Sequence, residues 1–235
     1  HCITFTIHII PASFQNMGLA PEITDDYFNL ICASTVVWFS IYMYTFITIQ
    51  SKEHFGTNPF CMSGHAIVAV LLCICSLYFD DESKFPEAFV VCYGIGFFIV
   101  DTFDCIVRMD WMFILHGILG LIFFYLASLT QYYNLRAGSM GYFVEASTPF
   151  YHIWKAKKTK ETMGYFLLVF FLTRIVWSPI FLHKIYSVEE LDKLTIYGFA
   201  MFYVLNCAWF MKGVQLYMNY KNDYKKDEKH DSKRA

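Results

Sequence analysis

Apolar residues occur in long blocks along the chain, and short polar segments separate these blocks. A helix that crosses a bilayer needs about 20 predominantly apolar residues, and most of the blocks reach this length. The pattern therefore predicts seven membrane-spanning helices, of which the fifth is the shortest. Their approximate limits are Tyr27–Ile49, Met62–Phe79, Ala88–Val107, Trp111–Thr130, Ser139–Trp154, Met163–His183 and Leu194–Met218.

The spans form one domain, so the predicted fold is an all-α transmembrane bundle over residues 27–218. Residues 1–26 precede it, and because the sequence begins with His1 rather than Met, we expect this segment to be truncated or processed. Residues 219–235 form a charged tail without hydrophobic periodicity. We expect the tail to be solvated or disordered, with a weak contact to anionic lipid as the alternative.

Composition supports a polytopic membrane protein. The 235 residues are 57% hydrophobic, 20% aromatic and 16% charged, whereas a soluble domain carries about 25% charged residues. The formal net charge is −2, but it says nothing about partners because the charges are segregated along the chain. Membrane lipids are the expected partners, and no nucleic-acid partner is expected. The eight cysteines lack a paired CxxC set and fit buried, small apolar residues.

The distribution of Lys and Arg predicts the orientation in the membrane. With seven spans, one side holds Lys52, Arg108, the cluster "KAKKTK" and the basic tail. By the positive-inside rule, this side is the cytosol, or the matrix if the membrane is mitochondrial. The opposite side carries the acidic run "DDES".

Charged side chains lie inside the predicted spans, most densely in "FFIVDTFDCIVRMDWMFILHGILG". A charge near the bilayer centre costs at least ~2.5 kcal/mol on insertion scales, so each needs an explanation. Asp101, Asp104 and Arg108 share one helical face. Asp104 precedes Arg108 by four residues, which is the favourable order for an ion pair.

Asp101 lies deeper, and His116 matches its depth on the next span. Asp101 is eight residues before the turn near Met109, and His116 is seven residues after it. Both therefore lie ~10–12 Å up their helices. We expect the two side chains to meet across this hairpin.

The same count applies to the next hairpin, which turns near Thr159. Glu145 is fourteen residues before this turn, and Arg174 is fifteen after it, so we expect them to pair near mid-membrane. Pro149 and Pro179 free carbonyl groups beside these two charges. Two readings remain open: a satisfied structural network that fixes helix order, and an internal polar cavity for lipid binding or catalysis.

Four segments in order resemble the TLC domain, which is shared by translocon-associated TRAM proteins, ceramide synthases and CLN8-like proteins. The segments are "YGIGFFIVDTFD" (93–104), "FILHGILGL" (113–121), "YFVEASTPFYHIW" (142–154) and "FFLTRI" (170–175). The resemblance covers roughly residues 27–218. It implies that Asp101, His116, Glu145 and Arg174 correspond to the family's polar positions, and that the endoplasmic reticulum is the expected location.

The sequence departs from the ceramide-synthase signature. Leu115 stands where those enzymes have the first of two adjacent histidines, and no His-Asp pair follows "YNLRAG". The chain is therefore more similar to the CLN8-like or TLC-domain-only branch.

Three functions fit these observations. The preferred one is a non-catalytic protein that binds, senses or regulates membrane lipid through a polar network of Asp101, Asp104, His116, Glu145 and Arg174. The alternatives are a structural subunit of a larger membrane complex, which a mitochondrial inner membrane would favour, and an N-acyltransferase that uses His116 as general base and Asp101 as its orienting group. The sequence has no phosphate-binding Gly loop, nucleophile elbow or metal-spaced His/Cys set, so neither a cofactor nor a metal is expected.

Overall fold

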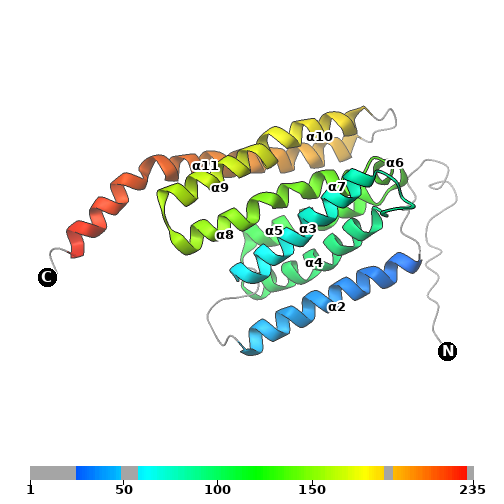
Figure 1. The fold of residues 1–235 in the computed structure, drawn as a ribbon, viewed down its shortest axis with the longest axis horizontal. Coiled ribbons are helices and arrows are strands. Elements are labelled where there is room, and N and C mark those ends of the chain that lie inside the picture. The colour runs from blue at the N-terminus through cyan, green and yellow to red at the C-terminus, as the bar shows by residue number, and fades with distance from the viewer. Residues whose placement is uncertain (1–24, 49–57, 188–192, 232–235) are drawn as a thin grey trace.

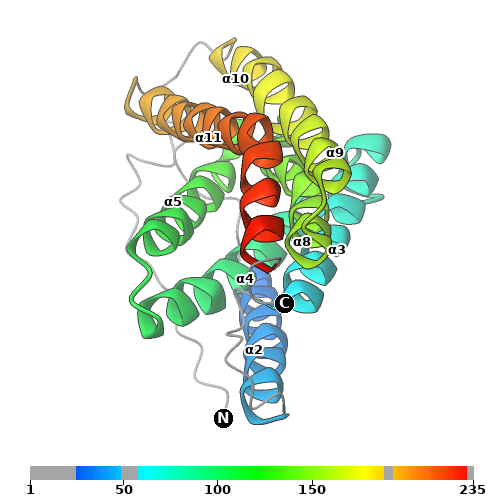
Figure 2. The same cartoon turned by 90° about the vertical axis from the view of Figure 1, so that its left-hand side faces the viewer.

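The computed structural model of the chain describes residues 25–48, 58–187 and 193–231, and this part is helical and contains no strand. The elements run from α2 at one edge of the bundle to α10 and α11 at the other (Figures 1 and 2). In chain order they are α2 Asp25–Thr48, α3 Pro59–Phe79, α4 Ala88–Val107, α5 Trp111–Ala127, α6 Thr130–Tyr133, α7 Ala137–Tyr142, η2 Phe143–Ser147, α8 Thr148–Lys157, α9 Lys160–Phe170, η3 Phe171–Val176, α10 Trp177–Tyr186 and α11 Lys193–Asp231.

The all-α membrane bundle is confirmed, and each of the seven apolar blocks is helical. The fifth block corresponds to α7, η2 and α8, and the sixth to α9, η3 and α10. By length and hydropathy, four helices in the described residues can cross a membrane, and an apolar helix at Phe113–Ala127 is shorter. The four are Tyr27–Ile47, Pro59–Phe79, Ala88–Val107 and Lys160–Tyr186. The count of seven spans therefore stays a prediction.

Helix α4 lies inside the bundle because its neighbours approach it closely on two sides. A Cβ atom at Gly96 would lie 2.3 Å from the hydroxyl of Ser34 on α2. On the other side, a Cβ atom at Gly117 of α5 would lie 2.2 Å from the hydroxyl of Thr102 on α4. Glycine at these points lets the helix backbones approach each other.

The two hairpin turns lie where the sequence predicts them. Met109 has a positive φ of 56° between α4 and α5, which is a left-handed conformation that ends a helix. Lys158 has a φ of 49° and ends α8, and the hydroxyl of Thr159 accepts a hydrogen bond from the backbone N–H of Thr162 to cap α9.

The tail differs from the expectation of disorder, because α11 continues past Met218 to Asp231. No Gly or Pro follows Gly213, and Lys and Glu are good helix formers, so nothing in the sequence ends the helix earlier. The alternative of a disordered tail therefore does not hold as far as Asp231, whereas solvation of the tail stays a prediction.

Candidate functional site

A buried polar cluster surrounds Arg174, which is 6% exposed. Its Nη2 lies 3.4 Å from Oε1 of Glu145, as the count along the hairpin predicts. Its Nε donates to the hydroxyl of Ser147 at 2.9 Å, and its Nη1 donates to Oδ1 of Asn206 at 3.2 Å. The hydroxyl of Thr148 donates to the other Glu145 oxygen at 2.6 Å. The cluster therefore joins the fifth and sixth apolar blocks to α11.

Irregular helix geometry places both charged groups. Glu145 lies in the 3₁₀ segment η2, which ends just before the turn that contains Pro149. Arg174 lies in the π-helical segment η3, five residues before Pro179. Proline removes a backbone donor and disturbs the preceding turn, so both irregular segments lie where the prolines predict them.

Asp104 and Arg108 also pair as expected. Arg108 Nε lies 2.8 Å from Asp104 Oδ2, and its Nη1 lies 3.6 Å from the carboxylate of Asp110. Arg108 is the residue after α4, so its charge lies at the end of the helix. This cluster is a helix-end ion pair.

His116 does not meet Asp101, so the predicted second pair is absent among the described residues. The His116 ring lies 5.8 Å from the centroids of Phe98, Phe202 and Trp209, and its Nδ1 is buried without a hydrogen-bond partner. The neighbouring residues Thr102 and Gly117 lie side by side, so the two helices are level here, but depth alone does not fix the rotation of a side chain about the helix axis. Phe98 and Thr102 of α4 face α5 instead, and Asp101 is buried to one side of them.

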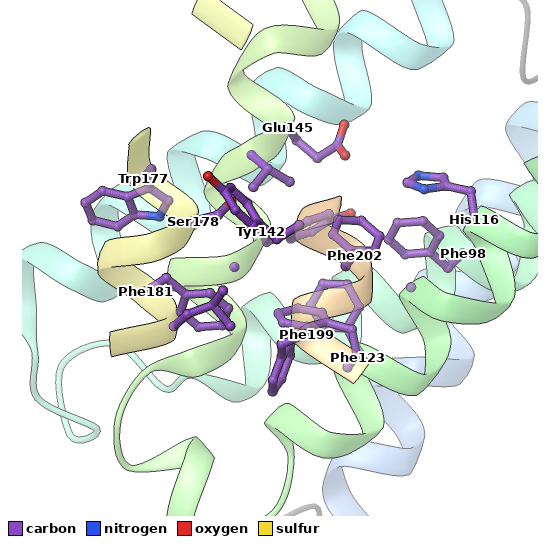
Figure 3. Close-up of a pocket in the computed structure, with 16 residues that line it drawn as sticks. Phe98, His116, Phe123, Tyr142, Glu145, Trp177, Ser178, Phe181, Phe199 and Phe202 are labelled. Carbon is purple, nitrogen blue, oxygen red and sulfur yellow. The ribbon is translucent and has the colours of Figure 1, made fainter. Parts of the chain in front are cut away.

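His116 and Glu145 line a central cavity of about 50 Å³ (Figure 3). Its walls are predominantly aromatic and include Phe98, Phe123, Tyr142, Phe181, Phe199 and Phe202. A cavity of this size holds water, whereas pockets for larger ligands have volumes of ~300–1,000 Å³. The polar network therefore fits the structural reading, and its cavity is too small for a lipid chain.

A larger space of about 930 Å³ lies between α2 and α3, with residues of α4 in its wall. The space is called the α2–α3 groove below. Trp38 and Ile41 line it from α2, Gly64 and Val68 from α3, and Tyr93 from α4. Its residues recur three or four apart on each helix, the same spacing as in any apolar helix face. Sequence reasoning missed the groove for this reason.

The groove and the central cavity share a wall. The Tyr142 hydroxyl, from the cavity, lies 2.7 Å from Nε2 of His65, which lines the groove. The His65 ring stacks on Phe97, its backbone carbonyl accepts from the Tyr93 hydroxyl at 3.1 Å, and its Nδ1 is buried without a partner. His65 is fully buried.

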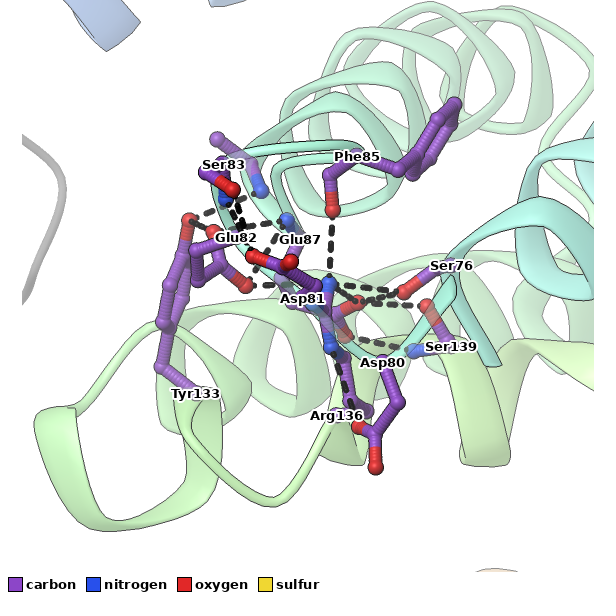
Figure 4. Close-up of polar contacts among 11 residues, drawn as sticks. Ser76, Asp80, Asp81, Glu82, Ser83, Phe85, Glu87, Tyr133, Arg136 and Ser139 are labelled. Atoms are coloured by element: carbon purple, nitrogen blue, oxygen red, sulfur yellow. Dashed lines mark hydrogen bonds and ion pairs between the residues drawn. The ribbon is translucent and has the colours of Figure 1, made fainter. Parts of the chain in front are cut away.

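A second polar network joins the segment between α3 and α4 to Arg136 (Figure 4). It lies at the opposite end of α4 from Arg108, because Glu87 directly precedes this helix and Arg108 directly follows it. Arg136 is 3% exposed and lies 2.9 Å from Glu82, 3.6 Å from Asp80 and 3.8 Å from Glu87. Glu87 accepts hydrogen bonds from the hydroxyl of Ser76 and from both the hydroxyl and the backbone N–H of Ser139, and both serines are buried. Sequence reasoning placed Arg136 and this acidic run in loops. The spacing of the acidic residues in "DDES" and at Glu87 does not indicate that their carboxylates surround one arginine.

The family model described as the TLC domain matches residues 28–221. The match covers most of the chain, so this protein belongs to the TLC-domain family, and it is an integral membrane protein. No curated protein and no solved structure matches it.

Proposed function

We propose that this chain is a non-catalytic TLC-domain protein that binds a bilayer lipid, with the hydrocarbon chain held in the α2–α3 groove. The observation that carries this proposal is the size and chemistry of the groove. Its volume of about 930 Å³ falls within the range of ligand pockets. None of the described residues that line it is Asp, Glu, Lys or Arg, so a hydrocarbon chain would bury apolar surface against them without stripping water from a charge.

The surroundings of His116 support binding over acyl transfer. A general base needs a partner that orients its ring, and no carboxylate is bonded to His116 among the described residues. Glu145 is already engaged by Arg174 and Thr148. Given a sphingoid base and acyl-CoA, the purified protein is expected to make no N-acyl product above background. Turnover that disappears in His116→Ala would contradict this expectation.

Filling the groove tests the binding proposal directly. A Cβ atom at Gly64 meets no atom within 4 Å, so Gly64→Phe places a ring in the groove without a backbone clash. Gly198 on α11 is equally open and lies outside the groove, so Gly198→Phe is the matched control. The readout is the lipid retained by the purified protein, measured by mass spectrometry, together with saturation binding of a fluorescent acyl-chain lipid.

Gly64→Phe is expected to lower the affinity for the probe by about tenfold. The ring would occupy part of the groove, so the acyl chain of the probe would bury at least about two fewer CH₂ groups. Gly198→Phe is expected to bind as the wild type does. Equal affinity in all three proteins, with thermal midpoints that show each is folded, would refute the groove as the lipid site.

Location follows the family expectation of the endoplasmic reticulum. Fluorescence microscopy of the tagged protein against organelle markers tests it. A signal in the mitochondrial inner membrane would instead favour the role of a complex subunit, which co-purification in mild detergent would then examine.

A further inference from the structure

Four lysines lie within six residues at the turn between α8 and α9: Lys155, Lys157, Lys158 and Lys160. The first three are exposed and Lys160 is half-buried. Glu161 is the only acidic residue between Tyr151 and Phe170, and no ion pair involves these lysines among the described residues. Residues 151–170 therefore carry a formal net charge of +3, and no carboxylate of the described side chains pairs with these lysines.

The backbone of this lysine turn is fixed by several hydrogen bonds. The N–H of Lys158 donates to the carbonyl of Trp154 at 2.7 Å, and Thr159 caps α9. The hydroxyl of Tyr220 on α11 donates to the carbonyl of Lys158. The Trp154 ring also stacks on Phe166 with centroids 5.9 Å apart. A fixed turn presents its charges without an added cost of ordering the backbone.

Aromatic rings hold two of the ammonium groups without removing their charge. Lys155 lies 5.8 Å from the Tyr151 ring, and Lys160 lies 4.7 Å from the Tyr217 ring. A ring attracts a cation through its quadrupole but is itself neutral. The positive charge therefore remains available to an anion.

The spacing along α9 is consistent with a turn at the depth of the lipid headgroups. Tyr165 is 63% exposed and begins an apolar exposed surface on α9 that Leu168 continues. It follows Lys160 by five residues, a rise of ~7.5 Å along the helix. The headgroup layer on each side of the hydrocarbon core is ~5–7.5 Å thick, so Lys160 lies near its outer edge when Tyr165 is at its inner edge.

We propose that the α8–α9 turn binds the anionic headgroups of the leaflet that it faces. Each lysine near such a surface strengthens the attraction, and salt weakens it within a Debye length. The site is separate from the α2–α3 groove, so it does not depend on the function proposed above. Such binding would anchor the ends of α8 and α9 that meet at this turn to anionic lipid.

The test uses the full purified chain in neutral detergent micelles, titrated with fluorescent phosphatidylserine or phosphatidylcholine at about 0.05 M and about 0.5 M NaCl. The main variant is Lys155→Gln, Lys157→Gln, Lys158→Asn and Lys160→Gln combined, with Asn at the left-handed position because Asn tolerates it. The control replaces Lys84 and Lys184, at the opposite end of the bundle, by Gln.

Wild type and control are expected to prefer phosphatidylserine by about tenfold at low salt, and the quadruple variant by less than about twofold. High salt is expected to remove the preference. A quadruple variant that keeps the preference would overturn the proposal, as would a control that loses it. Full competition by soluble glycerophosphoserine at equal concentration would show a free-phosphate site and would also overturn it.

Lys157→Gln alone covers the case in which the quadruple variant does not fold. Lys157 is exposed at the end of α8, and its side chain makes no ion pair or ring contact in the described part. A reduction of the phosphatidylserine preference by about twofold or more, with an unchanged thermal midpoint, supports the proposal. No reduction overturns it.

Discussion

Two buried arginines hold this bundle together in different ways. Arg174 lies among the spans and faces one carboxylate, Glu145, together with the neutral groups of Ser147 and Asn206. Arg136 lies at the end of the bundle and faces three carboxylates, of which Glu87 is fully buried, whereas the side chains of Asp80 and Glu82 are exposed.

The difference follows from access to water. Deep in the bundle an excess charge has no solvent to screen it, so one acid balances one base and neutral donors and acceptors complete the shell. At the end of the bundle, water hydrates the surplus carboxylates, so three acids can share one arginine. The same residue type is thus part of a neutral cluster in one region and of an acidic cluster in the other.

The largest effect is expected from breaking the deep pair. Arg174→Leu leaves Glu145 buried and unpaired, at a cost of ~3–5 kcal/mol by analogy with soluble proteins and less if the unfolded chain finds partners in the membrane. The double variant with Glu145→Leu should be more stable than Arg174→Leu alone. Unfolding measurements on both singles and the double, in one detergent, give the coupling energy. Strictly additive losses would show that the two residues do not act as a pair.

A smaller loss is expected at the end of the bundle. Arg136→Leu removes the hydrogen bonds to the Ser76 hydroxyl and the Phe85 carbonyl and leaves Glu87 without its cation. We expect a loss of about 2–3 kcal/mol, below that of Arg174→Leu, because Glu87 keeps its serine donors and the other acids are hydrated. A loss equal to or above that of Arg174→Leu would contradict the comparison.

Glu87 gives the end network a dependence on pH. Burial raises the pKa of Glu87 above its ordinary value of 4.5, and the hydrogen bonds from Ser139 and Ser76 and the charge of Arg136 offset only part of this effect. A carboxyl group with a raised folded-state pKa binds its proton more strongly in the folded chain, so stability falls as pH rises from 4.5 through the raised pKa. Thermal midpoints against pH should show this fall in the wild type.

Glu87→Gln removes the titrating group and should remove its part of that fall. Other titrating groups are the same in both proteins, so the difference between the two pH profiles isolates Glu87. Parallel profiles would show that Glu87 has the same pKa in the folded and unfolded chain.

The smallest effect is expected outside both networks. Lys84 pairs with Asp81 at 3.3 Å, and both side chains are largely exposed. Exposed ion pairs contribute little because solvent screens them, so Lys84→Ala should leave the thermal midpoint within experimental error. A clear loss would mean that the acidic loop depends on Lys84 as well as on Arg136.

The sequence determined the features that depend on distance along the chain. Hydropathy located the helical blocks, and the turns near Met109 and Thr159 followed from where the blocks end. Counting from the second turn put Glu145 level with Arg174, and the i, i+4 spacing paired Asp104 with Arg108. These predictions succeed because a helix rises by a fixed ~1.5 Å per residue, so depth can be counted from a turn.

The tertiary structure decided what depends on rotation and on third partners. Rotation of α4 turned Phe98 rather than Asp101 toward His116. Packing left a space of about 930 Å³ between α2 and α3 and only about 50 Å³ beside Glu145, and it brought Arg136 to Glu87 from a distant part of the chain. Sequence spacing sets the height of a side chain, but the direction in which it points into the bundle depends on how several helices pack at once, and this choice is made by contacts between residues far apart in sequence.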